Sequence, residues 1–373
     1  MELERKYIIN LLNPNFHTNM GPTTLLDWDK ILKMAFAQGV ANLIYLELKN
    51  SQIPSQIKSI FEKSYENTLV LNLLNLQAIE NIEQICQNEK INVMTLKGAS
   101  LLDHIYTKAG MRPMTDIDLM VRPCDLPRFE MLLEQLEYRR SAELTHIFKK
   151  GHSIIDLHTH ALNTDRIASR KYLFPQGMNP VWEQAQPWKP GFLCVKNPHH
   201  TDNVLLLSQH FMKHSFSKLI WLVDIYRLLQ PFKKRDWQKL KERALLLEQE
   251  RPLSYSIFLL HLYFDYHPPP ESGFETSRVK INLIEKTILK NSLFDVLSAR
   301  LGPLISLFCV QGFKNRTRFA LENLFPGEKV VGHEFKKYYA GKRIWLYPMR
   351  FIQALALIAK QFIGVCLTCF LKK

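Results

Sequence analysis

Residues 91–121 read INVMTLKGASLLDHIYTKAGMRPMTDIDLMV, and this stretch decides the predicted fold. It begins with a short apolar run that ends at Gly98, and it closes with DIDLMV, a second run of alternating character. The sequence between them, ASLLDHIYTKAG, has apolar residues at helical spacing and ends at Gly110. The stretch therefore predicts a strand, a helix and a second strand.

The same texture continues to about residue 165. Residues 125–137 have the spacing of an amphipathic helix, and 144–148 and 153–158 have the composition of two further strands. Strand signals then fade, and several prolines punctuate an irregular connection. Residues 91–165 therefore predict a small α/β core.

The rest of the chain has mainly helical patterns. Before the core, apolar residues keep a helical period over 27–48 and over 55–89. After it, helical patterns return between 201 and 266, and three consecutive prolines then mark a linker. We expect five parts: a helical N-terminal region 1–90, the core 91–165, a helical domain 166–267, a helical C-terminal region 268–345 and an apolar C-terminal helix 346–373.

Two aspartates stand at the start of the second predicted strand. Side chains at i and i+2 of a strand share one face, so Asp116 and Asp118 would project side by side while Ile117 and Leu119 face the core. Such a pair is costly unless a divalent cation neutralises it, and oxygen ligands suit Mg²⁺ or Mn²⁺. Asp156 would complete a two-metal site if its strand is a neighbour. The alternative is a turn or a solvated strand face without metal.

Small and basic residues flank the aspartate pair. A glycine turn before a helix leaves backbone N–H groups free for a phosphate, and Gly98 stands at such a place. Lys97 and Arg112 are candidate phosphate cations on either side of the predicted helix. These residues predict a phosphate site beside the carboxylates.

The run LKGASLLDHIYTKAGMRPMTDIDLMV, the helix 125–138, IIDLHTHAL, an HxxxH helix and WLVDIYRLL together resemble a bacterial family of uncharacterised nucleotidyltransferases in the polymerase-beta-like superfamily. FAQGVANLIYLELK resembles the family's N-terminal helices, and the likeness covers roughly residues 5–245. The resemblance implies an α+β fold in which a polymerase-beta-like core, a small mixed sheet with flanking helices, lies between helical N- and C-terminal regions. It also implies metal-dependent transfer of a nucleoside monophosphate from a nucleoside triphosphate to an unknown acceptor hydroxyl, with release of pyrophosphate.

The resemblance also implies which residues act. Asp116 and Asp118 match the two metal-binding acids of the superfamily. Asp156 matches the third, which would help to deprotonate the acceptor hydroxyl. One ion held by all three would lower the pKa of that hydroxyl, and a second, held by Asp116 and Asp118, would grip the triphosphate.

Phosphate-binding positions follow in the same way. Gly98 matches the glycine of the first turn, and Lys97 and Arg112 match basic positions of this family. Ser100 is the candidate hydroxyl of the turn. The wider superfamily has Gly-Gly or Gly-Ser soon followed by the acid pair, whereas a longer helix is expected here before Asp116.

Three histidines and one more aspartate are accessory candidates. His210 and His214 lie at i and i+4 of a predicted helix, which suits a metal or a role near the nucleotide, with hydrogen bonding inside the fold as the alternative. His158 shares a strand face with Asp156, so it would orient that acid, touch phosphate or be an ordinary strand histidine. Asp224 would cap a helix or pair within the protein.

Charge is unevenly distributed along the 373 residues. Lys and Arg number 49 against 35 Asp and Glu, a net charge of +14, and residues 311–373, the basic C-terminal segment, hold 12 basic and 3 acidic residues. With its interleaved aromatic side chains, this segment predicts contact with nucleic acid or with an anionic membrane surface. The apolar run 351–373 predicts an interfacial or internally packed helix rather than a membrane span, because Lys360 interrupts it.

Composition and cysteine usage bound the class of protein. With 46% hydrophobic residues the chain can bury a large core, which excludes disorder. The six cysteines lie far apart except for Cys366 and Cys369, and the first residues contain no apolar stretch of signal length, so we expect a cytoplasmic enzyme, with peripheral contact at the inner membrane as an addition. Cys366 and Cys369 are expected to pack in a core, with redox or zinc chemistry as the alternative. A non-catalytic nucleic-acid-binding module and a membrane-surface assembly protein are the alternative functions.

Overall fold

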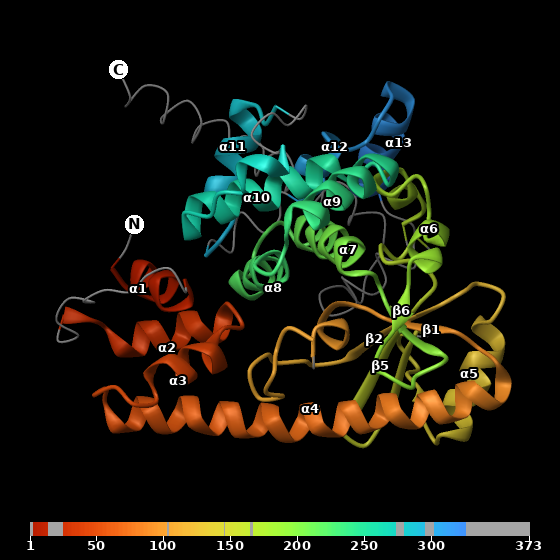
Figure 1. Ribbon diagram of the computed structural model, residues 1–373, viewed down its shortest axis with the longest axis horizontal. Helices are drawn as coiled ribbons and strands as arrows, with labels where there is room; N and C mark the ends of the chain where they lie inside the picture. The colour runs from red at the N-terminus through yellow and green to blue at the C-terminus, as the bar shows by residue number, and fades with distance from the viewer. Residues whose placement is uncertain are drawn as a thin grey trace, which may run out of the picture.

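The computed structural model describes residues 3–13, 25–102, 104–144, 146–164, 167–273, 280–294 and 302–325. Its elements in chain order are α1 (Leu3–Leu12), α2 (Trp28–Ala37), α3 (Ala41–Leu48), α4 (Ser55–Glu89), β1 (Val93–Thr95), η2 (Lys97–Ser100), β2 (Ile117–Val121), α5 (Leu126–Gln135), β3 (Arg139–Arg140), β4 (Ile147–Lys150), β5 (Ser153–His158), η3 (Ala168–Leu173), α6 (Asn179–Glu183), β6 (Gln186–Pro187), β7 (Val195–Asn197), α7 (His200–Lys213), α8 (Leu219–Leu229), α9 (Lys234–Leu246), α10 (Glu250–Phe264), η4 (Pro270–Ser272), α11 (Leu283–Lys290), α12 (Gly302–Leu307) and α13 (Phe313–Leu324). In Figure 1 the long helix α4 runs along one side, with α1–α3 at one end, the sheet at the other and α7–α10 across from it.

The strands form one mixed sheet. Their order is β3-β4-β5-β2-β1-β7-β6, with β2 parallel to β5 and β1 parallel to β7. The other four neighbouring pairs are antiparallel. The predicted α+β fold, a mixed sheet with helical flanks, is confirmed.

Helix α4 holds one end of the sheet in place. It has 35 residues and ends where Lys90 adopts a left-handed backbone, with φ of 55°. Near this end the buried carboxylate of Glu83 accepts hydrogen bonds from the backbone N–H groups of Leu193, Cys194 and Val195. A side chain of the N-terminal helices therefore fixes the start of β7, which lies more than a hundred residues later.

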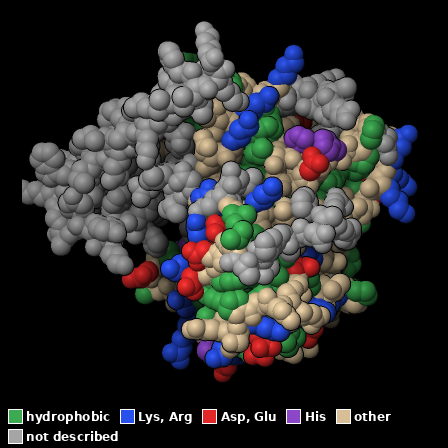
Figure 2. Space-filling view, turned by 90° about the vertical axis from the view of Figure 1, so that its left-hand side faces the viewer, with side chains coloured by type: hydrophobic (Ala, Val, Ile, Leu, Met, Phe, Trp, Pro, Cys, Tyr) green, Lys and Arg blue, Asp and Glu red, His purple; other side chains and the backbone are tan. Residues whose placement is uncertain are grey.

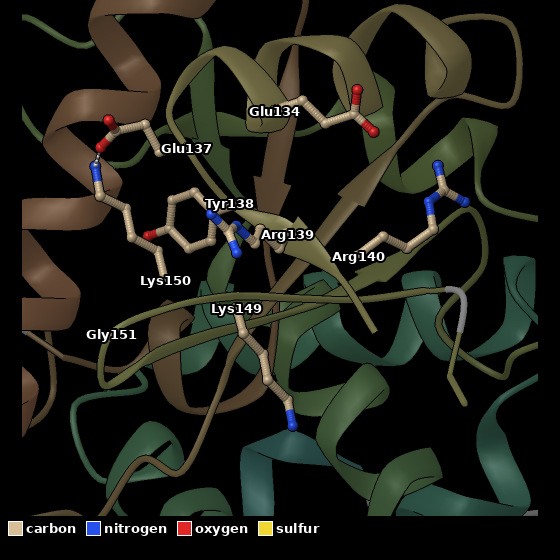
Figure 3. Close-up of a pocket in the computed structure, with 8 residues that line it drawn as sticks. All are labelled: Glu134, Glu137, Tyr138, Arg139, Arg140, Lys149, Lys150 and Gly151. Atoms are coloured by element: carbon tan, nitrogen blue, oxygen red, sulfur yellow. Dashed lines mark ion pairs between the residues drawn. The ribbon is translucent and has the colours of Figure 1, made fainter. Parts of the chain in front are cut away.

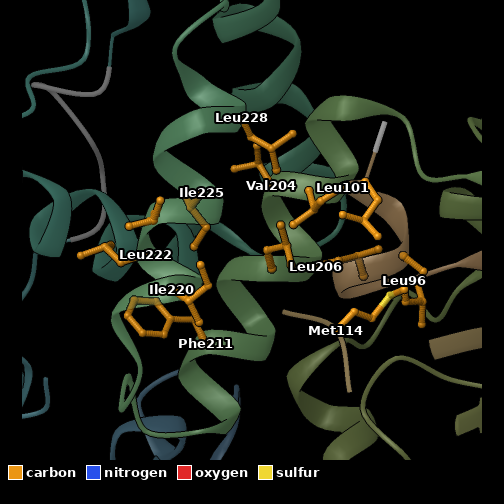
Figure 4. Packing of buried hydrophobic residues seen from close by; sticks show 14 of the residues in the cluster. Leu96, Leu101, Met114, Val204, Leu206, Phe211, Ile220, Leu222, Ile225 and Leu228 are labelled. Atoms are coloured by element: carbon orange, nitrogen blue, oxygen red, sulfur yellow. The ribbon is translucent and has the colours of Figure 1, made fainter. Parts of the chain in front are cut away.

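Helices α7 and α8 pack on the segment that links β1 to β2 (Figure 4). One buried apolar cluster joins the three elements, with Val204, Leu206 and Phe211 from α7, Ile220, Leu222, Ile225 and Leu228 from α8, and Leu96, Leu101 and Met114 from the segment. All of these side chains are buried. The turn η2, which begins at Lys97, contacts both β2 and α7.

The predicted helix between the two central strands is wrong. Residues after Gly98 form the short 3₁₀ turn η2 and then irregular turns, with an isolated bridge between Leu102 and Tyr106. Tertiary contacts override the helical spacing here, because Tyr106 is fully buried and its hydroxyl donates to Asp224 of α8 at 2.6 Å.

Two other sequence predictions need correction. The expected helix 27–48 is split into α2 and α3, because Gly39 takes a left-handed backbone with φ of 71°. Strands do not end near residue 165, since β6 and β7 join the sheet and β7 pairs with β1. Strand β6 has two residues and β7 has three, so neither is long enough to show an alternating pattern. The expected boundaries of the five parts stay predictions.

Most of the basic C-terminal segment follows Phe325 and lies outside the described residues, as do Cys366, Cys369 and the apolar run 351–373. Contact with nucleic acid or a membrane through this segment stays a prediction. Within the described ranges, no helix combines the length and apolar character that crossing a bilayer requires. Figure 2 shows acidic and basic side chains interspersed on the face that it displays.

Candidate active site

Strand register brings two predicted acids together. β2 and β5 are parallel neighbours in which Asp118 stands directly opposite Asp156, so both carboxylates project from the same face. Asp116 immediately precedes β2, two residues before Asp118, and is half-buried. The condition under which Asp156 can join the acid pair, that its strand lies next to that of Asp118, is met.

Two basic side chains, Lys97 and His158, contact the buried carboxylate of Asp118. Lys97 Nζ donates to Asp118 Oδ1 in a short ion pair, and His158 Nε2 lies 2.9 Å from the same oxygen. His158 Nε2 also lies 3.2 Å from Asp156 Oδ2, so the imidazole bridges the two carboxylates. Lys97 has a left-handed backbone with φ of 50°, a strained conformation of the kind found at functional sites.

This arrangement shifts the pKa values of its members. Burial alone would raise the pKa of Asp118, but the charge of Lys97 and the hydrogen bond with His158 outweigh it and lower the pKa. Burial alone would lower the pKa of His158, yet its hydrogen bonds with Asp118 and Asp156 raise it overall. The pKa of Asp116 is raised, first by burial and next by the charge of Asp118. The repulsion within the acid pair is therefore only partly relieved by protein cations.

Asp156 provides a test of whether a metal ion fits. Its Oδ1 is buried and accepts no hydrogen bond from any described residue, while His146 Nε2 lies 3.6 Å away. A buried carboxylate oxygen without a donor is rare and calls for a partner such as an ion. Ligand atoms of Asp118, Asp156 and His158 lie within 4.8 Å of one another. The two carboxylates suit Mg²⁺ or Mn²⁺, with the imidazole as the group that orients them.

His146 was not among the predicted site residues. It immediately precedes β4, inside the predicted strand 144–148, and reaches Asp156 because β4 pairs with β5. The signal that would have found it is the two-residue connection Gly151–His152. A turn of this length sets the register of the hairpin, which pairs Ile147, the residue after His146, with Asp156.

Arg112 is buried and bound within the protein. Its Nε lies 3.0 Å from Asp224 Oδ1, and its Nη2 lies 2.8 Å from Asp224 Oδ2. The remaining nitrogen, Nη1, donates to the carbonyl oxygen of Pro113 at 3.2 Å. Asp224 therefore pairs internally, one of its two expected roles, and the phosphate-binding role of Arg112 stays a prediction.

Gly98 and Ser100 belong to η2. A Cβ atom on Gly98 would come within 2.6 Å of Arg112 Nη1, so only glycine permits this close approach. Ser100 Oγ donates to the carbonyl oxygen of Lys97 at 2.8 Å, and Asn203 Nδ2 of α7 donates to Ser100 Oγ at 3.1 Å. These contacts position Lys97. The N-terminal cradle of a longer helix does not form, and phosphate binding by Gly98 or Ser100 stays a prediction.

His210 and His214 share a face at the end of α7, as their spacing predicts. Their ring centroids lie 4.5 Å apart, and both rings pack against Trp221 of α8. Crowding by protein atoms, and next the neighbouring positive charges, lower the pKa of His214 to about 3. Neither histidine belongs to a metal-ligand cluster among the residues that the structure describes. Their accessory role stays a prediction.

A second group of possible ligands lies at the end of α10. His261, Asp265 and His267 are all exposed, and their ligand atoms also lie within 4.8 Å of one another. The group has no strand register and no buried carboxylate behind it. The Asp118 cluster is the one that the fold builds from separate strands.

The mixed sheet and its flanking helices form an α+β core of the kind expected for a nucleotidyltransferase. Residues 24–265, more than half of the chain, match the family described as uncharacterised nucleotidyltransferase, and the chain belongs to this family. It is therefore an enzyme of the nucleotidyltransferase class, which implies a nucleoside triphosphate as substrate. Comparison with curated proteins gives no match, and neither does comparison with solved structures.

Proposed function

We propose that this protein is a polymerase-beta-like enzyme that transfers a nucleoside monophosphate from a nucleoside triphosphate to an acceptor hydroxyl, with Mg²⁺ or Mn²⁺ bound at Asp116, Asp118 and Asp156. The observation that carries the proposal is the register of β2 and β5, which sets Asp118 opposite Asp156 on one face. The Oδ1 of Asp156, buried and without a hydrogen-bond donor among the described residues, supports a cation at this point.

A divalent ion at this site would polarise the triphosphate and lower the pKa of the attacking hydroxyl. The protein residues have separate tasks around it. His158 holds Asp118 and Asp156 in fixed orientations through Nε2, and burial, followed by the charge of Asp118, raises the pKa of Asp116. We assign Asp156 to take the proton of the acceptor hydroxyl.

Lys97 is the residue that we assign to the phosphates. Its ammonium group contacts the acid pair directly, because Nζ donates to Asp118 Oδ1. Its left-handed backbone is fixed at the start of η2. A lysine ammonium is a compact charge that binds phosphate oxygens well. Arg112 is less suited to this task, because Asp224 and Pro113 occupy its nitrogens.

The test uses the purified full chain with Mg²⁺ or Mn²⁺ and each labelled nucleoside triphosphate in cell extract. We expect release of pyrophosphate and transfer of label to one extract fraction. A chelator should stop both, and added Mg²⁺ should restore them. An absence of pyrophosphate release with every triphosphate and both metals would contradict the proposal.

A further inference from the structure

The sheet face that carries the acids continues beyond them. Asp156 on β5 stands opposite Ile147 on β4, and Ile154 stands opposite Lys149. Lys149 in turn stands opposite Arg139 on the edge strand β3. Residues that are paired across strands, or two apart along one strand, share a face. Arg139 and Lys149, here called the cation pair, therefore lie on the carboxylate face.

This face is open at β4 and β5, whereas the opposite face is covered. On the opposite face Phe148 and Ile155 are fully buried. Helix α5 lies on this face: Arg140, which stands opposite Phe148, forms an ion pair with Glu130 of α5. On the carboxylate face Ile154 is only half-buried, and both members of the cation pair are exposed. A bound molecule could lie along this face from the acids to the sheet edge.

The cation pair lines a surface hollow of about 750 Å³ at the β3–β4 hairpin (Figure 3). The two other cations of the hollow are neutralised, Lys150 by Glu137 at 3.1 Å and Arg140 by Glu130. Glu134, the remaining acid of the lining, lies apart from the cation pair in the view of Figure 3. The side chains of the cation pair make no ion pair or hydrogen bond with any residue in the described ranges.

Like charges directly opposite each other destabilise an antiparallel pair of strands. An anion between them would remove that repulsion and use both charges, and a guanidinium beside an ammonium is well suited to a phosphate. The lining of the hollow therefore offers a phosphate two cations, Arg139 and Lys149, that no described acid neutralises.

We propose that the cation pair binds a phosphate group of the acceptor, so that the acceptor of this enzyme is a phosphate-bearing molecule. The inference rests on the proposed function. With strands about 4.8 Å apart and a rise of about 3.3 Å per residue, the Cα atoms of Lys149 and Arg139 lie about 8 and 12 Å from that of Asp156. The phosphate would lie roughly 10 Å from the hydroxyl that attacks at the acids.

The experiment measures binding to two probes, a fluorescein-labelled single-stranded oligonucleotide by anisotropy and glucose 6-phosphate by calorimetry, with glucose as the uncharged comparison. The variant Arg139→Gln with Lys149→Gln should weaken binding of at least one phosphate probe about tenfold. In the oligonucleotide arm, loss of two phosphate contacts should also reduce the slope of log affinity against log salt by about 1.4. Preference for one probe tells a nucleic-acid acceptor from a small phosphorylated one.

The matched control is Arg128→Gln with Lys189→Gln, which removes the same charge from residues outside the hollow that are already paired with Glu89 and Glu80. This control should change binding less than twofold. Equal losses in the two variants, or no binding of either phosphate probe by the unaltered chain, would overturn the proposal.

A transfer assay separates this inference from the proposed function. Labelling of the extract acceptor should fall with the cation-pair variant and persist with the control. If the unaltered chain transfers label and the cation-pair variant transfers it equally well, the acceptor proposal fails and the proposed function stands. If the probes bind through the cation pair but no triphosphate is turned over, the proposed function fails.

Discussion

Two buried ion clusters meet at the turn η2, and they differ in how completely their charges are satisfied. In one cluster both oxygens of Asp224 accept hydrogen bonds, from the guanidinium of Arg112 and the hydroxyl of Tyr106. In the other, Asp118 pairs with Lys97 and shares His158 with Asp156, and one oxygen of Asp156 has no hydrogen-bond donor among the described residues. A saturated cluster stabilises the fold, whereas an unsaturated one retains the capacity to bind an ion.

The largest effect should come from breaking the saturated cluster. Asp224→Ala leaves the buried guanidinium of Arg112 without its carboxylate, and we expect a loss of about 3–5 kcal/mol in the free energy of unfolding. Chemical denaturation measures this loss. Glu66→Ala, which removes an exposed carboxylate from the interior of α4, is the control and should change stability little.

The unsaturated cluster should respond in activity instead. Asp116→Asn should reduce nucleotide transfer by about 100- to 1000-fold. The free energy of unfolding should stay within about 0.5 kcal/mol, because Asp116 has no cationic partner among the contacts described and its repulsion with Asp118 is relieved. Pyrophosphate release and denaturation together check this. Asp118→Asn should lose both activity and stability, because Lys97 and His158 lose their shared carboxylate. Transfer that persists in both variants would contradict the assignment.

Gly98→Ala tests the link between the clusters. The new methyl group would meet Arg112 Nη1 at 2.6 Å, so we expect a loss of about 1–3 kcal/mol from overpacking. Combined with Asp224→Ala, which already frees Arg112, the loss should be smaller than the sum of the two single losses. Strict additivity of the denaturation energies would show that Gly98 does not act through Arg112.

Glu83 is a third buried carboxylate, satisfied by neutral donors, and should give the smallest effect. Burial alone would raise its pKa, but hydrogen bonds from Gln87 and from the N–H groups before and within β7 lower it overall. A lowered pKa contributes stability above the unfolded value of about 4.3 that is lost as the pH falls through the folded pKa. Glu83→Gln should therefore cost about 1 kcal/mol at pH 7 and progressively less in acid. Equal losses at pH 7 and pH 3, measured by denaturation, would contradict this.

The sequence predicted the acids well because they depend on local rules. Alternation within DIDLMV separates the apolar and acidic faces of β2, and the same alternation marks Asp156 on β5. The sequence-based prediction failed for the segment between β1 and β2. The spacing of ASLLDHIYTKAG is helical, but the Tyr106 hydroxyl donates to Asp224, which lies more than a hundred residues away in the chain. A local pattern cannot reveal a partner at that distance.

Arg112 shows the same limit at the level of a single side chain. A basic residue beside an acid pair is a reasonable phosphate ligand on charge alone. The packing of α8 brings Asp224 to it, and burial makes that pair the more favourable use of the guanidinium. His146 was missed because its contact with Asp156 depends on the pairing of β4 with β5. The sequence around His146 alone does not indicate a site.

The sequence by itself therefore determined which residues form the strands, which face of each is acidic, and to which family the motifs point. Those properties follow from side-chain period and residue chemistry within short windows. Only the tertiary structure decided which charges are satisfied: Arg112 by Asp224, Asp118 by Lys97 and His158, and neither member of the cation pair by any described residue. Satisfaction of charge depends on which elements pack together, and that packing is a property of the whole fold.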